Sequence, residues 1–171
     1  MSTSEHLILR REQPSDRASI RSVTEAAFGR ADESDLIDRL RTEGAVLASF
    51  VAEQEAQIVG YVIFSRMLIE KTDAPIAAVA LAPMAVLPER QRRGIGGRLL
   101  AHGLEWLRGR GERIVIVLGH PNYYPRFGFS SDRARAFTSP FPAEALMALE
   151  LQPGALDGIR GTVRYPDAFG L

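Results

Sequence analysis

The sequence predicts one domain of the α/β class over residues 1–171, with helices packed on a largely antiparallel sheet. The hydrophobic period alternates along the chain between helical and strand-like spacing. The resulting order is a strand, two helices, three strands, a helix, a strand and a mixed tail, which is typical of layered α/β domains. A length of 171 residues suits one compact core, and 46% apolar with 25% charged residues is ordinary globular composition.

The N-terminal part is predicted to hold one strand and two helices. Residues 7–11 are predicted to form the strand. Ser15 or Asp16 would then cap a first helix, because these side chains accept hydrogen bonds from free helical N–H groups. In the same way, Ser34 or Asp35 would cap a second helix.

Three strands are predicted to follow. Residues 46–53 and 58–69 would pair as a hairpin, and the absence of an Asn-Gly pair leaves its turn type open. Residues 76–87 would form the third strand. Pro83 predicts a bulge or a break in the hydrogen-bond ladder of that strand, because proline has no N–H to donate.

The second half is predicted to begin with a helix that starts in a glycine-rich run and stops near Gly109. Residues 114–118 are five apolar residues in a row, which predicts a strand buried on both faces. Residues 119–129 are irregular and rich in aromatic side chains. The glycine-rich tail leads to residues 163–165, which we interpret as one arm of a last hairpin.

Composition excludes several classes of site. The absence of cysteine excludes disulfides, thiolate metal sites and a cysteine nucleophile. The three histidines form no i, i+4 pair, so no metal site is predicted. Because 21 basic residues balance 21 acidic ones, the charge gives no sign of a nucleic acid or membrane partner. Neither a signal peptide nor a bilayer-length apolar run is recognisable, so we expect a cytoplasmic protein.

The most informative segment is the junction at residues 91–98, Gln-Arg-Arg-Gly-Ile-Gly-Gly-Arg. A helix start leaves about four backbone N–H groups without partners, and no Ser, Thr, Asp or Asn is present here to cap them. Free donors at the positive end of a helix dipole, beside three arginines, favour a phosphate or pyrophosphate ligand. Glycines would let the backbone approach that ligand closely.

Three nucleotide-binding patterns compete for this junction, beside a plain glycine-rich turn with solvated arginines. A Walker A loop requires Gly-Lys-Ser/Thr, which is absent. A Rossmann fingerprint requires a third glycine where Leu99 stands, and it follows the first strand rather than the fourth. The pattern Gln-x-x-Gly-x-Gly after Ala85-Val86-Leu87-Pro88 resembles the acetyl-CoA pyrophosphate loop of the GNAT superfamily of N-acetyltransferases.

A second motif supports this resemblance. Tyr124, Gly128 and Phe129 match the Tyr-x-x-x-Gly-Phe signature that closes the cofactor site of the family. The longer run Leu-Gly-His-Pro-x-Tyr-Tyr-x-Arg-Phe-Gly-Phe resembles a largely uncharacterised bacterial branch of predicted acetyltransferases. The resemblance covers nearly the whole chain. It implies a single-domain GNAT-type fold, with a mixed, mostly antiparallel sheet of about six to seven strands flanked by helices.

The resemblance also implies roles for particular residues. The diphosphate would bind the loop amides, the pantetheine arm would add to the strand edge, and the backbone N–H of Met84 would polarise the acetyl carbonyl. Tyr124 would protonate the departing thiolate. In an extended segment Tyr123 would point the opposite way. The implied acetyl-CoA contacts are Met84, Ala85, Val86, Gln91, Arg92, Arg93, Gly94, Ile95, Gly96, Gly97, Arg98, Asn122 and Tyr124.

The implied activity is transfer of the acetyl group of acetyl-CoA to a primary amine, by direct attack in a ternary complex. The acceptor, a small molecule or a protein, stays open. The general base is equally open between Glu70, Asp73, His120 and water. A non-catalytic acyl-CoA sensor and a transferase that uses a longer acyl-CoA are the alternatives. Family habit also implies a possible homodimer through the C-terminal strands.

Overall fold

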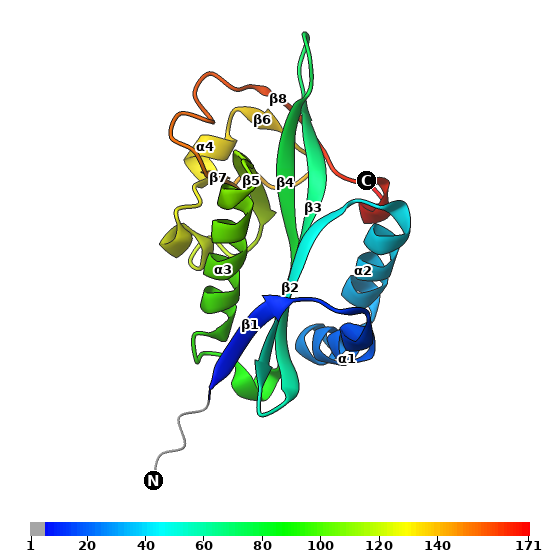
Figure 1. Ribbon diagram of the computed structural model, residues 1–171. Coiled ribbons are helices and arrows are strands. Elements are labelled where there is room, and N and C mark those ends of the chain that lie inside the picture. Colours follow the sequence, from blue (N-terminus) through cyan, green and yellow to red (C-terminus); the bar gives the residue numbers. More distant parts are fainter. Residues whose placement is uncertain (1–5) are drawn as a thin grey trace. The chain divides into compact units, whose positions relative to one another are not determined.

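A computed structural model describes residues 6–171, and Figure 1 shows their α/β fold. The first five residues of the domain predicted over residues 1–171 lie outside this described part. The strands are β1 (Leu7–Arg11), β2 (Val46–Gln54), β3 (Gln57–Glu70), β4 (Ile76–Val86), β5 (Ile114–Leu118), β6 (Phe137–Thr138), β7 (Leu146–Glu150) and β8 (Gly161–Arg164). The α-helices are α1 (Arg17–Phe28), α2 (Asp32–Glu43), α3 (Ile95–Gly109) and α4 (Ser131–Ala134). Short 3-10 helices are η1 (Pro14–Asp16), η2 (Pro88–Arg90), η3 (Tyr124–Phe127) and η4 (Asp167–Phe169).

The strands hydrogen-bond in the order β1-β2-β3-β4-β5-β7, and β8 pairs with β3 and β6. The predicted mixed, mostly antiparallel sheet is therefore confirmed, with eight strands instead of six or seven. The additional strand β6 has two residues, too few to produce a hydrophobic period.

The chain also divides into two compact units. Unit 1 holds the described residues up to Ile63 and Pro83–Gly103, and unit 2 holds Phe64–Ala82 and Leu104–Leu171.

Unit 1 contains the N-terminal strands and helices. Strands β1 and β2 are antiparallel, with Leu7 opposite Gln54. The turn between β2 and β3 consists of Glu55 and Ala56, with φ values of 52° and 61°. Two left-handed residues in a two-residue loop are the pattern of a type I′ turn, whose twist matches that of the strands. Figure 1 shows α1 and α2 on one side of β2 and the first half of α3 on the other.

The starts of α1 and α2 correct the predicted caps. Asp16 is the N-cap residue of α1, as predicted, but its side chain makes no hydrogen bond to that helix. Its carboxylate instead accepts the backbone N–H of Gln13 at 2.7 Å. Helix α2 begins at Asp32, so the predicted cap at Ser34 or Asp35 is wrong. Acidic side chains in the first turn explain the earlier start, because they interact favourably with the positive end of the helix.

Unit 2 contains the second half of the sheet. Strand β5 pairs parallel with β4 from Val79 to Leu81 and antiparallel with β7 along its whole length. Its first four residues are buried, which agrees with the predicted strand buried on both faces, whereas Leu118 is 39% exposed. Strand β8 pairs antiparallel with β3, with Ile69 opposite Val163. The predicted last hairpin is therefore wrong, because β7 and β8 have different partners.

Pro83 stands where the two units divide along β4. The strand continues from Ile76 through this proline to Val86, and the division between units falls between Ala82 and Pro83. The side chain of Pro83 is buried. The bulge expected at this residue stays a prediction.

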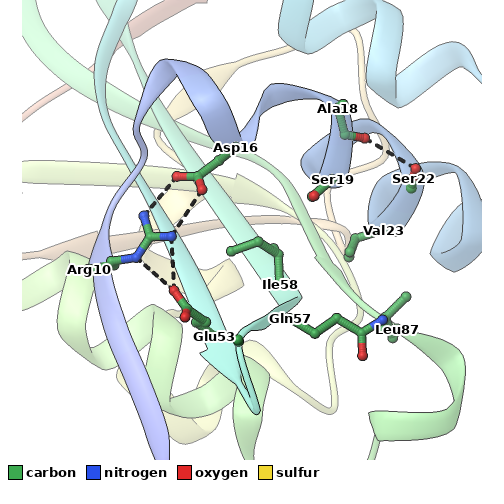
Figure 2. A pocket seen from close by; sticks show the side chains of 11 residues that line it. Arg10, Asp16, Ala18, Ser19, Ser22, Val23, Glu53, Gln57, Ile58 and Leu87 are labelled. Carbon is green, nitrogen blue, oxygen red and sulfur yellow. Dashed lines mark hydrogen bonds and ion pairs between the residues drawn. The ribbon is translucent and has the colours of Figure 1, made fainter.

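A partly buried ion pair fixes the connection between β1 and α1 in unit 1. The two outer nitrogens of Arg10 donate to the two carboxylate oxygens of Asp16 at 2.7 and 3.0 Å, and its Nε donates to Glu53 at 3.0 Å (Figure 2). Asp16 is 7% exposed. The hydrogen bonds from Arg10 outweigh burial and hold the pKa of Asp16 below its ordinary value.

We expect Asp16→Asn to lower the free energy of unfolding by roughly 2 kcal/mol at pH 7, because a charged hydrogen-bond pair is lost. A lowered native pKa means that this contribution is present above about pH 4 and disappears as the pH falls through the native pKa. Urea unfolding between pH 7 and 3 should therefore show the difference from wild type shrinking. Asp132→Asn, which breaks an exposed ion pair with Arg135, should have little effect. A deficit in Asp16→Asn that is constant with pH would contradict this explanation.

Candidate active site

The glycine-rich junction forms an exposed loop that leads into α3 in unit 1. The carbonyl of Gly94 accepts the N–H of Arg98 at 3.0 Å, so Gly94 holds the N-cap position of the helix. Gly94 has a left-handed φ of 81°, and Arg92 has one of 62°. Arginine rarely adopts this conformation, and such strain is common in loops that hold ligands. As predicted, the helix starts without a Ser, Thr, Asp or Asn at its cap.

Three arginines around this loop have no carboxylate partner. Arg92, Arg93 and Arg98 are exposed, and within residues 6–171 none of them forms an ion pair. The neighbouring Arg90 differs, because it donates to the side chain of Gln54 at 3.0 Å. The loop therefore presents three positive charges that no carboxylate of the described chain neutralises.

Gln91 connects the loop to the end of β4. Its side-chain amide donates to the carbonyl of Val86 at 3.0 Å. Just beyond β4, the N–H of Leu87 donates to the carbonyl of Val59 at 2.9 Å. The loop and the strand end, which the sequence predicted as two parts of one site, are thus joined within unit 1. Met84 and Val86 are half-buried and Ala85 is buried, as expected for alternating strand residues.

Sequence reasoning missed Gly60, which lies in β3 beneath the start of α3. A methyl group at this position would lie 2.9 Å from Leu99 Cδ1 and 3.3 Å from Ile95 Cγ2. The absence of a side chain at Gly60 therefore allows the first turn of α3 to lie close to the strand. A glycine inside an otherwise apolar strand is the sequence signal that indicates such close packing.

The predicted tyrosine, Tyr124, begins η3 in unit 2. The assumption that Tyr123 and Tyr124 lie in an extended segment is wrong, because Tyr123 has αR dihedral angles and Tyr124–Phe127 form a 3-10 turn. Their ring centroids are 5.1 Å apart at an interplanar angle of 89°. Tyr123 also contacts Phe127, whereas Tyr124 contacts Phe129. Of these two phenylalanines, Phe129 is buried and Phe127 is only half-buried.

The two phenols also differ in their electrostatic surroundings. Burial, and then the neighbouring Tyr123 phenol, raise the pKa of Tyr124 to about 12. Burial also raises the pKa of Tyr123, but Arg126 opposes this rise with its guanidinium 4.7 Å from the ring centroid. The Tyr124 hydroxyl makes no hydrogen bond to any residue between 6 and 171. At neutral pH this hydroxyl is therefore protonated, and it is available to donate a hydrogen bond to a ligand.

The candidates for the general base differ in whether their side chains already have a hydrogen-bond or salt-bridge partner. Glu70 accepts from Arg164 Nε at 2.6 Å in a salt bridge. Asp73, His120 and the predicted ligand contact Asn122 are exposed. A carboxylate that sequence reasoning missed, Glu12, is held by Arg41, by Ser49 Oγ at 2.5 Å and by Tyr61 Oη at 2.8 Å. Its bonds are structural, because they join the residue that follows β1 to α2, β2 and β3.

A pocket of about 480 Å³ lies in unit 1 beside α1 (Figure 2). Its wall contains Arg10, which pairs with both Asp16 and Glu53, and the hydroxyl of Ser22 donates to the carbonyl of Ala18. The polar groups of this wall are therefore largely satisfied within the chain. None of the predicted ligand contacts lines it.

Two further classes of site find no support in the described chain. No helix between residues 6 and 171 is long and apolar enough to cross a membrane. Over the same span, no group of three or more His, Asp or Glu side chains is arranged to hold a metal ion.

Comparison with known proteins identifies the family. The acetyltransferase (GNAT) domain model matches residues 47–131. The uncharacterised N-acetyltransferase YjhQ of Escherichia coli K12 is 38% identical over 167 residues, which cover 91% of this chain and 92% of YjhQ. YhbS of the same strain is 31% identical over 166 residues, which cover 95% of this chain and 98% of YhbS. The chain therefore belongs to the GNAT family of N-acetyltransferases and is an acyltransferase.

Solved structures agree with this assignment. The crystal structure of E. coli YhbS in complex with CoA matches with a TM-score of 0.92 at 28% identity, over 100% of this chain and 96% of that chain. A GNAT acetyltransferase from Brucella melitensis in complex with acetyl-CoA matches with a TM-score of 0.81 at 38% identity, over 96% of this chain and 99% of that chain. The family and fold that the two motifs implied are confirmed.

We expect Gly60→Ala to lower the free energy of unfolding by about 1–3 kcal/mol, because a methyl group would overpack the contact with α3. Shortening the opposing side chain in Gly60→Ala/Leu99→Val should recover part of that loss. Gly109→Ala is the matched control, because nothing lies within 4 Å of a methyl group there. Urea unfolding would measure all three variants. Wild-type stability in Gly60→Ala would show that the contact tolerates a side chain.

Proposed function

We propose that the chain is an N-acetyltransferase that binds acetyl-CoA and transfers its acetyl group directly to a primary amine in a ternary complex. The observation that carries the proposal is the junction at residues 91–98, with its uncapped helix start and unpaired arginines. The CoA and acetyl-CoA complexes of the two structural relatives support the choice of donor. The acceptor stays open between a small molecule and a protein amine, and the predicted cytoplasmic location and homodimer remain predictions.

The loop fits a diphosphate on three grounds. The first turn of α3 offers N–H groups without a side-chain cap, at the positive end of the helix dipole. A methyl group at Gly94 would meet nothing within 4 Å, so the space above the backbone is open. Arg92, Arg93 and Arg98 add positive charge, and none of them forms an ion pair with a carboxylate between residues 6 and 171. The main-chain donors would do most of the holding, because the attraction of exposed arginines is weakened by water and salt.

The end of β4 would bind the extended arm of the cosubstrate. We propose that amides between Met84 and Val86 pair with the arm as an added strand would. The backbone N–H of Met84 would then polarise the acetyl carbonyl as negative charge develops on its oxygen. The hydrogen bond from Gln91 to Val86 supports this proposal, because it fixes the strand end against the phosphate loop.

Tyr124 would act as the general acid. The amine nitrogen forms the new C–N bond, the C–S bond breaks, and Tyr124 Oη donates its proton towards the departing sulfur before regaining one from solvent. The phenol pKa of about 12 keeps this proton in place at neutral pH. Transfer to an ordinary thiolate of pKa near 8.5 is uphill by about 3.5 pKa units, or roughly 5 kcal/mol. Tyr124 therefore acts chiefly by donating a hydrogen bond to the departing sulfur. Its proton moves towards the sulfur only as negative charge develops there.

Deprotonation of the amine has no dedicated residue in this proposal. Glu70 is occupied by Arg164, which makes it the least suitable of the predicted bases. Asp73 and His120 are exposed, so each is free to accept a proton through water. Water-mediated loss of the amine proton fits these observations best.

We expect Gly96→Asp to abolish binding of acetyl-CoA, because a carboxylate would stand where the diphosphate binds. Isothermal calorimetry would measure affinity, and circular dichroism would check the fold. Gly109→Asp places the same charge at the opposite end of α3, where a methyl group meets nothing, and should bind normally. Wild-type affinity in Gly96→Asp would rule out this loop as the phosphate site.

We expect Tyr124→Phe to lower turnover roughly 10²-fold with little change in acetyl-CoA affinity, because only the proton donor is removed. The basic limb of the pH profile should change as well. Tyr123→Phe removes a hydroxyl from the adjacent ring and should remain nearly fully active. Steady-state kinetics on an amine found by a CoA-release screen would test both variants. Full activity in Tyr124→Phe, or loss of activity in Tyr123→Phe instead, would reject this role. If the wild-type protein binds acetyl-CoA but turns over no amine, it is a sensor instead of an enzyme.

A further inference from the structure

We infer that Gly119 is a positioning residue, whose missing side chain makes the space in which the Tyr124 ring lies. The inference rests on the proposed role of Tyr124 as general acid. Both residues belong to unit 2, where Gly119 directly follows β5 and Tyr124 begins η3. Neither motif that indicated the family assigns a function to this glycine.

The distances leave no room for a side chain at this position. A methyl group on Gly119 would lie 2.3 Å from Cε2, 2.8 Å from Cδ2 and 3.4 Å from Cζ of Tyr124. Contacts below 3.0 Å are essentially never seen for a real Cβ atom. Gly119 is not among the residues with positive φ, so its backbone is one that other residues adopt. Glycine is therefore required here for space rather than for conformation.

The backbone of Gly119 is held in place by its neighbours. Its N–H donates to the carbonyl of Ala145 at 3.1 Å, just past the paired ends of β5 and β7. On the next residue, the carbonyl of His120 accepts the N–H of Tyr123 at 3.1 Å, which closes the turn before η3. If a methyl group were added at Gly119, the Tyr124 ring would have to move.

The ring has little freedom to move sideways. Phe129, which is 2% exposed, meets it edge-on at 5.7 Å between centroids, and Tyr123 meets it at 5.1 Å. A methyl group at Gly119 would therefore push the ring, and the hydroxyl at its far end, out of its present position. A displacement of about 1 Å costs a positioned catalytic group roughly 10²-fold in rate.

The decisive variant is Gly119→Ala, measured by steady-state kinetics and acetyl-CoA calorimetry. We expect turnover to fall roughly 10²-fold with unchanged acetyl-CoA affinity. Gly119→Ala/Tyr124→Phe should be no slower than Tyr124→Phe alone, because both changes remove the same interaction. Gly109→Ala, with open space around its methyl group, is the matched control and should keep wild-type turnover.

A second measurement observes the ring itself. With ¹³Cζ-labelled tyrosine, the four tyrosines give four NMR signals, and the Tyr124 signal is the one lost in Tyr124→Phe. In Gly119→Ala that signal should shift, while those of Tyr61 and Tyr165 stay unchanged. An unshifted Tyr124 signal overturns the inference, whatever the turnover. If Tyr124→Phe proves fully active, the acid role fails on its own, and the NMR shift still tests the contact.

Folding of the variant is a separate control. If Gly119→Ala does not fold, the double variant Gly119→Ala/Tyr124→Ala has room for the new methyl group and should fold as Tyr124→Ala does. Thermal unfolding of the three variants would measure this. Recovery in the double variant supports the contact, and failure to recover overturns it.

Discussion

The position of α3 on the sheet depends on the missing side chain of Gly60. Because β3 presents no Cβ there, Leu99 and Ile95 reach the strand directly and fix the first turn of the helix. The N–H groups of that turn are thereby fixed in direction before any ligand arrives. Gln91 holds the preceding loop to Val86, so the proposed phosphate site is preorganised by packing as much as by its own motif.

The sequence was sufficient for the class and order of the elements, because hydrophobic period and buried runs are local properties. It was insufficient where a structure depends on distant or electrostatic partners. Helix α2 starts at Asp32 because its first turn is acidic, without a capping side chain. Strand β8 pairs with β3 across more than ninety residues, between Thr162 and Glu70, and no local pattern specifies that register.

Parts of the candidate site were predicted where they depend on residues adjacent in sequence, and were missed where they depend on distant ones. The proposed phosphate loop was recognisable because its glycines and arginines are adjacent in sequence. The turn at Tyr124 was mistaken for an extended segment, although Pro125 in its first turn and Gly128 at its end, with φ of 94°, are ordinary signals for a turn. The spatial roles of Gly60 and Gly119 depend on residues at least five positions away, so only the fold reveals them.

Net charge was a poor guide to the ligand, and the arrangement of ion pairs explains why. Among the arginines that pair with carboxylates elsewhere in the chain are Arg10, Arg21, Arg30, Arg41, Arg66, Arg133 and Arg164. Arg92, Arg93 and Arg98, around the glycine loop, are exposed and form no ion pair with any residue between 6 and 171. Because salt screens charge beyond about 8 Å under physiological conditions, a bound anion senses this local excess and not the zero sum over 171 residues. A protein with no net charge can therefore hold a highly charged cosubstrate where several basic side chains without ion-pair partners lie together.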